Sequence, residues 1–161
     1  MSQEHQWNRV LVPVDFSEAS RNGLQVARNL AARLGASIDL LHVIPVPDED
    51  GADLSASSHY NDVVLPNAKK MLQDFWDQAF LETGTGEDIR HVLDIMVSDG
   101  TAVCIVARAD SMRADLIVMG THGRSSIAMM IFGSVANEVV RYAPCGVITV
   151  REPVIERDSV D

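Results

Sequence analysis

The sequence predicts a single α/β domain in which five parallel strands form a doubly wound sheet. Short apolar segments rich in valine alternate with longer segments whose apolar residues recur at helical spacing. The chain has 161 residues, which is the ordinary size of one domain. Alternating strands and helices imply parallel strands joined by right-handed crossovers. We therefore expect the strand order 3-2-1-4-5, with helices on both faces of the sheet.

The first half of the chain contains two predicted strands and two predicted helices. Residues 9–15 (RVLVPVD) form the first strand, and Ser17 is a plausible N-cap for a helix that ends at Gly35. Residues 37–43 form the second strand. Proline, glycine and serine in residues 45–58 predict a long exposed loop. Helical spacing then resumes over 60–82, where Pro66 marks a kink or a new start.

The second half continues the alternation. Gly84 opens a turn, and the predicted elements after it are a strand at 89–97, a helix at 100–113, a strand at 116–119, a helix at 134–142 and a strand at 146–150. The segment LIVM at 116–119 is wholly apolar, as expected for a central strand covered on both faces. Residues 1–151 thus form one domain, and we expect residues 152–161 to be an acidic flexible tail.

The formal net charge is −10, and most of it falls in residues 45–58 and 152–161. This balance argues against nucleic acid and anionic membranes as partners, because phosphate-rich surfaces require clustered Lys and Arg. No apolar stretch approaches the length of a membrane span, and the N-terminus lacks the pattern of a signal peptide. We therefore expect a cytoplasmic protein with no membrane insertion.

The loop after the fourth predicted strand indicates a phosphate site. In a doubly wound sheet, ligands bind beyond the carboxyl ends of the strands where the strand order reverses. Here Asp15 ends one such strand, and Gly120 and Gly123 follow its neighbour, where they allow close backbone approach and positive φ. Gly133 and Ser134 open the next helix, whose first N–H groups can bind an anion. Arg124 adds charge, so the cradle is built mostly from backbone and contains no lysine.

The chain resembles the universal stress protein family. The resemblance rests on VLVPVDFSEAS near the start, LLHV in the second strand, and ADLIVMGTHGRSS followed by GSVANEVVRYAPCGVITVR near the end. The pattern G-x2-G-x9-G-[S/T] is the signature of the family's ATP-binding branch. It is complete here at Gly120, Gly123, Gly133 and Ser134.

The resemblance implies a set of nucleotide-binding residues. Pro13 and Val14 would line the base pocket, Asp15 would bond the ribose or adenine end, and the backbone of Val43 would meet the adenine edge. Ribose and phosphates would lie on the glycine-rich loop and the helix start. The residues implied there are Gly120, Gly123, Gly133 and Ser134, with Val135 and Arg124 close by.

The resemblance also implies a function and a partner. The bound nucleotide would be ATP, with ADP and AMP as alternatives and Mg²⁺ on the phosphates. Family members form homodimers through the last strand, here from Gly146 to Arg151. The expected role is regulatory: a protein partner would recognise whether the nucleotide is bound or which oligomeric state the protein has.

Alternative interpretations remain at this stage. Asp15 could be only a helix-capping residue, and the glycine loop only a structural connection. No residue is placed as a general base with an orienting partner, so we expect no efficient catalysis. A slow ATPase or another nucleotide-processing enzyme stays open, as does a nucleotide-free dimeric interaction module. A metal site is not expected, because His42 and His122 lack a third ligand at a suitable spacing.

Overall fold

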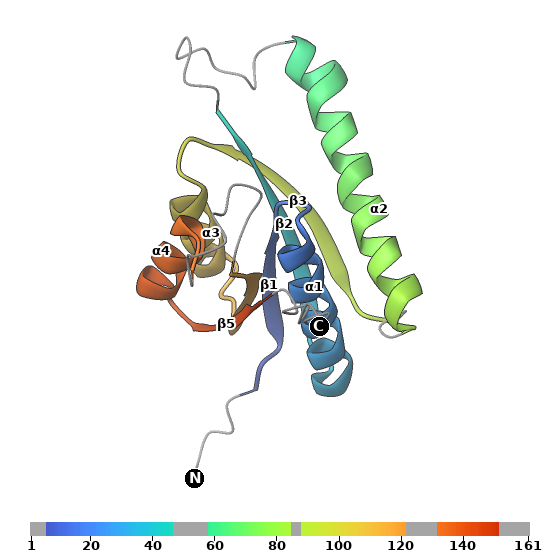
Figure 1. Cartoon of the computed structure of the whole chain (residues 1–161), viewed down its shortest axis with the longest axis vertical. Helices are drawn as coiled ribbons and strands as arrows, with labels where there is room; N and C mark the ends of the chain where they lie inside the picture. The colour runs from blue at the N-terminus through green and yellow to red at the C-terminus, as the bar shows by residue number, and fades with distance from the viewer. Residues whose placement is uncertain (1–5, 47–57, 85–87, 122–131, 152–161) are drawn as a thin grey trace, which may run out of the picture.

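The computed structural model describes residues 6–46, 58–84, 88–121 and 132–151 (Figure 1). Its strands form one five-stranded parallel sheet in the order β3-β2-β1-β4-β5, which confirms the predicted fold class and order. The elements along the chain are β1 (Arg9–Val14), α1 (Glu18–Leu34), β2 (Ser37–Pro45), η2 (Tyr60–Val64), α2 (Leu65–Thr83), β3 (His91–Ser98), α3 (Thr101–Ser111), β4 (Leu116–Gly120), α4 (Ser134–Tyr142) and β5 (Gly146–Val150).

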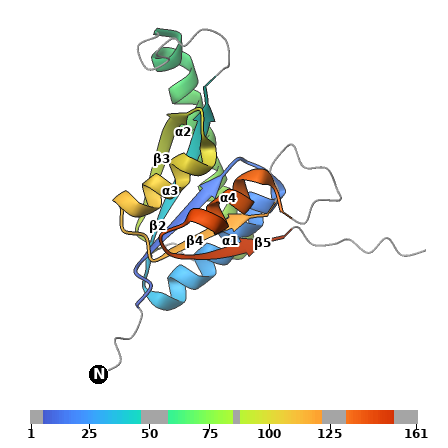
Figure 2. The same ribbon diagram turned by 90° about the vertical axis from the view of Figure 1, so that its left-hand side faces the viewer.

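Helices cover both faces of the sheet, as predicted. Helices α1 and α2 lie on one side, and α3 and α4 lie on the other (Figures 1 and 2). Each side has its own apolar core. Alternate residues of β1 divide between them, because successive side chains of a strand point to opposite faces: Val10 and Val12 pack on the α1 and α2 side, and Leu11 packs on the α3 and α4 side.

The ends of α1 follow the predicted capping residues. The Ser17 side chain accepts a hydrogen bond from the backbone N–H of Ser20 at 3.2 Å, which satisfies one of the unpaired donors of the first turn. At the other end Gly35 has φ 68°, the left-handed conformation that glycine adopts without steric cost. Both interpretations of this helix from the sequence are therefore confirmed.

The segment expected to be helical over 60–82 is helical throughout and contains two kinds of helix. A π-helical stretch, η2, occupies Tyr60–Val64, and the N–H of Leu65 bonds the carbonyl of Tyr60. Helix α2 follows directly, with Pro66 in its first turn. Val64 and Leu65 keep right-handed helical backbone angles, so the chain passes from η2 into α2 without leaving the helical conformation, and the predicted new start at Pro66 is not observed. The N-terminal half of α2 extends past the start of α1 (Figure 1).

Other differences from the predicted boundaries are small. Strand β2 continues to Pro45, two residues beyond the predicted end, and β3 begins two residues later than predicted. Of the predicted loop at 45–58, residues 47–57 lie outside the described residues, as do 85–87 and the predicted tail at 152–161. Among the described helices, none is both long and apolar enough to cross a membrane.

Candidate functional site

A cavity of about 860 Å³ lies at the carboxyl ends of the strands. This is within the range of small-molecule sites, roughly 300–1,000 Å³. Eight of the ten residues predicted for the site line this cavity, and Gly123 and Arg124 lie outside the described residues. The eight are Pro13, Val14, Asp15, Val43, Gly120, Gly133, Ser134 and Val135.

The cavity opens where the two central strands stop pairing. Strands β1 and β4 pair at Val10 with Leu116 and at Leu11 with Ile117. Farther along β1 lies Pro13, which has no N–H to donate to a neighbouring strand. The carboxyl ends of β1 and β4 thus border the cavity, at the point in the sheet where the strand order reverses.

Asp15 has a structural role in the turn between β1 and α1. Its Oδ1 accepts hydrogen bonds from the backbone N–H of Ser17, at 3.0 Å, and from the Ser17 hydroxyl. Ser17 in turn caps α1, so Asp15 orients the capping residue. Because Asp15 also lines the cavity, its capping role and its predicted ligand contact are compatible.

Phe16 lies between Asp15 and Ser17 in an unusual conformation. Its φ is 65°, which is uncommon for a residue with a side chain. The ring centroid lies 4.5 Å from that of His42 and 5.5 Å from that of Phe75. Backbone strain of this kind persists where surrounding contacts hold it, and it is concentrated at functional sites.

Gly120 shows one of the two properties predicted for it, a close backbone approach, but not a positive φ. Its φ is not positive, since Gly35 and Gly84 are the described glycines with positive φ. Instead, a Cβ on Gly120 would lie 2.6 Å from the carbonyl carbon of Ala19 and 2.8 Å from its oxygen. The missing side chain therefore allows the first turn of α1 to pack directly on the end of β4.

The start of α4 presents backbone donors to the cavity. Gly133 is the N-cap, with φ −68° and ψ 159°, and it offers no side chain to cap the helix. Its own N–H donates to the carbonyl of Thr121 at 2.7 Å, so Gly133 cannot use that donor for a ligand. The next N–H groups, beginning at Ser134, have no acceptor within the helix. They carry the positive end of the helix dipole.

Charge is nearly absent from the described lining. Asp15 is its only charged residue, and the lysines Lys69 and Lys70 are exposed on α2 outside it. Beneath the cavity, Arg108 of α3 pairs with Asp39 at 2.6 Å and with Asp94 at 3.2 Å. Burial raises the pKa of Asp39, and its hydrogen bond to Arg108 opposes that rise. None of these three residues lines the cavity.

Several lining residues were not predicted from the sequence. Helix α2 and η2 form one wall, although neither had been assigned to the site, because helical spacing does not reveal how a helix lies across a sheet. Thr101 and Ile105 of α3 were also missed. His42 of β2, considered above only as a possible metal ligand, also lines the cavity. The wall from η2 and α2 consists of Val63, Val64, Asn67, Ala68 and Met71.

Within the described part of the chain, no group of three or more His, Cys, Asp or Glu side chains is arranged to hold a metal ion. The Nδ1 atom of His42 lies 2.9 Å from the carbonyl oxygen of Val14. A carbonyl can only accept, so Nδ1 carries the hydrogen of this bond. His122 lies outside the described residues.

A parallel, doubly wound sheet with a cavity at its switch point defines a single-domain α/β protein with a small-molecule-sized site. The model of the universal stress protein family matches residues 6–151, and the chain belongs to this family.

Individual relatives agree with this assignment. A universal stress protein of Methanocaldococcus jannaschii is 25% identical over 158 residues, covering 93% of this chain and 85% of the relative. The solved structure of a universal stress protein from Lactobacillus plantarum is 28% identical, with a TM-score of 0.72 over 91% of this chain and 99% of that one. The structure of an Archaeoglobus fulgidus universal stress protein in complex with dAMP is 23% identical, with a TM-score of 0.62 over 90% of this chain and 98% of that one.

Proposed function

We propose that this universal stress protein binds an adenine nucleotide, ATP in the cell, and acts as a regulator. The observation that carries the proposal is that residues from β1, β2, β4 and α4, distant in sequence, line one cavity at the switch point of the sheet. A structural relative was solved with dAMP, which shares its adenine and one phosphate with the proposed ligand.

Each part of the nucleotide has a matching part of the cavity. Pro13 and Val14 supply apolar surface for the base, and the backbone of Val43 offers hydrogen-bonding groups to its edge. Asp15 would accept hydrogen bonds from the ribose hydroxyls or the adenine end. Phosphates would lie at the start of α4, near Gly133, Ser134 and Val135, with Gly120, Gly123 and Arg124 contributing from the preceding loop.

A chain of net charge −10 can still bind this anion. The lining carries one carboxylate, while the start of α4 provides N–H groups and the positive end of a helix dipole. Such a backbone cradle recognises one phosphate without selecting sharply among AMP, ADP and ATP. When Mg²⁺ accompanies ATP, it would be held by the phosphates, since among the residues that the structure describes no cluster of His, Cys, Asp or Glu could hold a cation.

The proposed role is regulatory, in the cytoplasm. Nucleotide occupancy would be reported to a protein partner by a homodimer that pairs through β5 and Arg151. We expect no efficient catalysis. Two alternative functions remain to be tested. The protein could be an enzyme that hydrolyses ATP slowly, or it could be a dimeric interaction module that binds no nucleotide.

The first test is whether the purified protein carries or binds nucleotide. Denaturing the protein and analysing the supernatant by chromatography should release adenine nucleotide, and calorimetry should show binding of added AMP and ATP. Replacing Gly133 by leucine should weaken AMP binding by at least about tenfold, because a side chain there would lie where phosphates meet the helix start. The backbone angles of Gly133 suit any residue, so the variant should fold.

The matched control is Asn137→Leu, which places the same side chain on an exposed position of α4 outside the cavity. It should leave the AMP affinity within about twofold of the original protein. Normal AMP binding by the Gly133→Leu protein would contradict the placement of the phosphates. No released nucleotide and no binding at millimolar ATP would favour the nucleotide-free module, and rapid phosphate release would favour the enzyme.

A further inference from the structure

Strand β3 forms the edge of the described sheet opposite β5, and no described strand pairs with its outer side (Figure 2). The N–H of Ile38 in β2 donates to the carbonyl of Arg90 at 2.9 Å, at the start of this pairing. Backbone groups alternate in direction along a strand, so the even-numbered residues of β3 direct theirs toward β2. The N–H and carbonyl groups of Leu93, Ile95 and Val97 therefore point toward the open edge.

This edge lacks the lysine, proline or bulge by which many edge strands avoid pairing with other chains. The eight residues of β3 contain neither residue type, and they pair with β2 in one unbroken register. One outward group before the strand is satisfied locally, because Nδ1 of His91 lies 3.0 Å from the carbonyl oxygen of Ile89. From His91 onward an extended chain could continue the sheet, which is a common mode of peptide recognition.

The side chains of β3 that face α3 alternate between apolar and acidic. Met96 packs on the core beneath α3 and α4, and Asp94 lies 3.2 Å from Nη2 of Arg108 in α3. Val92 points to the same side, because side chains two residues apart on a strand share a face. It is 55% exposed, so an added strand would cover an apolar side chain that the described fold leaves open.

Asp94 belongs to a group with a formal charge of −1. The same nitrogen of Arg108, Nη2, contacts Asp39 at 2.6 Å and Asp94 at 3.2 Å, so one guanidinium serves two carboxylates. The side chain of Asp39 is buried, whereas that of Asp94 is 29% exposed. A lysine or arginine on an added strand would lie directly opposite Asp94, and cross-strand pairs of opposite charge stabilise sheets.

We propose that the open edge of β3 binds an extended segment of a partner protein, which adds a strand to the sheet. The segment carries a lysine or arginine opposite Asp94 and apolar residues two positions away on either side, opposite Val92 and Met96. This pattern reads the same in both directions, so parallel and antiparallel segments fit. The segment would belong to the regulatory partner, and in that respect the inference rests on the proposed function, although binding at β3 does not require nucleotide.

A second copy of this chain fits the edge less well. Antiparallel pairing centred on Asp94 would set this carboxylate opposite its own copy, and like charges directly opposite each other are destabilising. A register shifted by two residues would set Asp94 opposite Val92 or Met96 and leave its charge without a partner. Charge complementarity therefore favours a basic partner segment.

Amide hydrogen exchange of the protein alone tests whether the edge is open. The outward amides of Leu93, Ile95 and Val97 should exchange at least about tenfold faster than those of Asp94 and Met96, which point toward β2. Equal protection of both sets would show that the edge is already covered, by a second copy or by another part of the chain, and would overturn the proposal.

Two peptides with blocked ends form a matched pair of probes. TVTRTVT carries the central arginine with valines two positions away, and TVTETVT differs only in its central glutamate. We expect calorimetry to give the arginine peptide a Kd on the order of 0.1–1 mM and the glutamate peptide a Kd at least about fivefold higher. Equal affinities, no binding of the arginine peptide at about 5 mM, or new amide protection at β5 in place of β3 would contradict the proposal.

Substitutions of Asp94 test the charge requirement. Asp94→Lys should reverse the preference, so that the glutamate peptide binds at least about fivefold more tightly than the arginine peptide. Asp94→Asn keeps the shape of the side chain and should remove the preference, which tests the same point if the lysine variant does not fold. A preference for the arginine peptide that persists in the folded variants would overturn the proposal.

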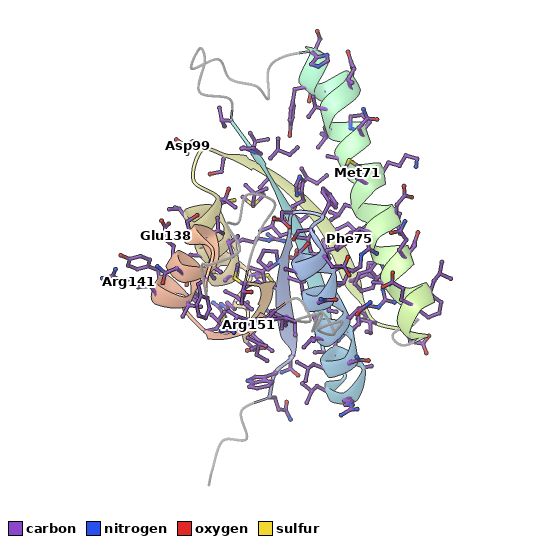
Figure 3. All side chains as sticks on the ribbon, viewed as in Figure 1. Met71, Phe75, Asp99, Glu138, Arg141 and Arg151 are labelled. Carbon is purple, nitrogen blue, oxygen red and sulfur yellow. The ribbon has the colours of Figure 1, made fainter. Side chains whose placement is uncertain are left out.

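Asp99→Lys is the matched control, because it makes the same change of charge just beyond the end of β3 (Figure 3). Five residues of extended chain separate it from Asp94 by about 16 Å. This exceeds the Debye length of about 8 Å at physiological ionic strength, so the preference for the arginine peptide should remain. Loss of the preference in this control would show that the peptides respond to overall charge and would contradict the site at Asp94.

Nucleotide binding and peptide binding can fail separately. Gly133→Leu should weaken AMP and leave the Kd of the arginine peptide within about twofold, because β3 does not contact the proposed phosphate site. If the peptide bound and AMP did not, the nucleotide function would be wrong and the site at β3 would stand. If AMP bound and the peptide did not, the proposed function would keep its nucleotide and the site at β3 would be wrong.

Discussion

Gly120 shows how one residue can satisfy a motif and a packing requirement together. It belongs to the glycine pattern that predicts a phosphate cradle, and it lines the cavity. Its backbone also lies against the first turn of α1, because a Cβ would come within 2.8 Å of three atoms of Ala19. On the other side of the same contact, Gly23 of α1 meets the backbone of Met119 and Gly120. Two glycines thus bring a helix and a strand together at the rim of the site.

Replacing Gly120 by alanine should destabilise the fold. The new methyl group would overlap backbone atoms of Ala19, which can be relieved only by moving the start of α1, and overpacking of this kind costs about 1–3 kcal/mol. Urea unfolding measures the change. Gly146→Ala is the control, because its Cβ would meet only Leu116 Cδ1 at 3.6 Å, an ordinary contact. A free energy of unfolding that is unchanged in Gly120→Ala would show that the contact relaxes at no cost.

At the scale of elements, the start of α1 joins the fold to the site. Ser17 caps the helix and lies outside the cavity lining, whereas Asp15 supports Ser17 and also lines the cavity. Ser17 therefore contributes to the structure alone, whereas Asp15 contributes to the structure and, in the proposed function, to ligand binding. Mutating them individually distinguishes the two interpretations of Asp15 that its position in the sequence allows.

Ser17→Ala should lower the free energy of unfolding by about 1 kcal/mol, the usual value of an N-cap, and should leave AMP affinity within about threefold. Asp15→Ala should also lower the free energy of unfolding. It should weaken AMP binding by about tenfold or more, because the site loses the carboxylate that would accept hydrogen bonds from the ligand. Thermal unfolding and calorimetry on each variant give both quantities. If Asp15→Ala altered stability alone, Asp15 would be a helix-supporting residue and the proposed ribose or adenine contact would be wrong.

The elements most fully predicted from the sequence are those whose signals are local. Periodicity located the strands and helices, and Ser17 and Gly35 marked the ends of α1, because caps act within one turn. The π-helical turn at η2 and the left-handed Phe16 were not predicted, since neither has a signature in residue type. The wall formed by α2 was missed for a different reason: it depends on how a helix crosses the sheet, which tertiary packing decides.

At the scale of the whole molecule, β5 is the edge strand of the described sheet, and its hydrogen bonds show which backbone groups point away from β4. The carbonyl of Val150 accepts from the N–H of Thr121 at 2.9 Å, so the polar groups of Val150 point toward β4. Those of Thr149 point the opposite way, because backbone groups alternate along a strand. The N–H of Thr149 is therefore directed to the open edge, where a second chain could pair in the proposed homodimer.

Thr149→Pro should convert the proposed dimer to a monomer. Proline removes the outward N–H and is tolerated on an edge strand, and the bonds between β4 and β5 do not use that donor. Sedimentation should give twice the chain mass of 17.6 kDa for the original protein and for Thr149→Val, which keeps the N–H, and a single chain mass for Thr149→Pro. Circular dichroism confirms that the variant is folded. If the Thr149→Pro protein remained dimeric, the proposed interface at β5 would be wrong. If the monomer bound AMP as well as the original protein does, the site at α4 would be complete within one chain.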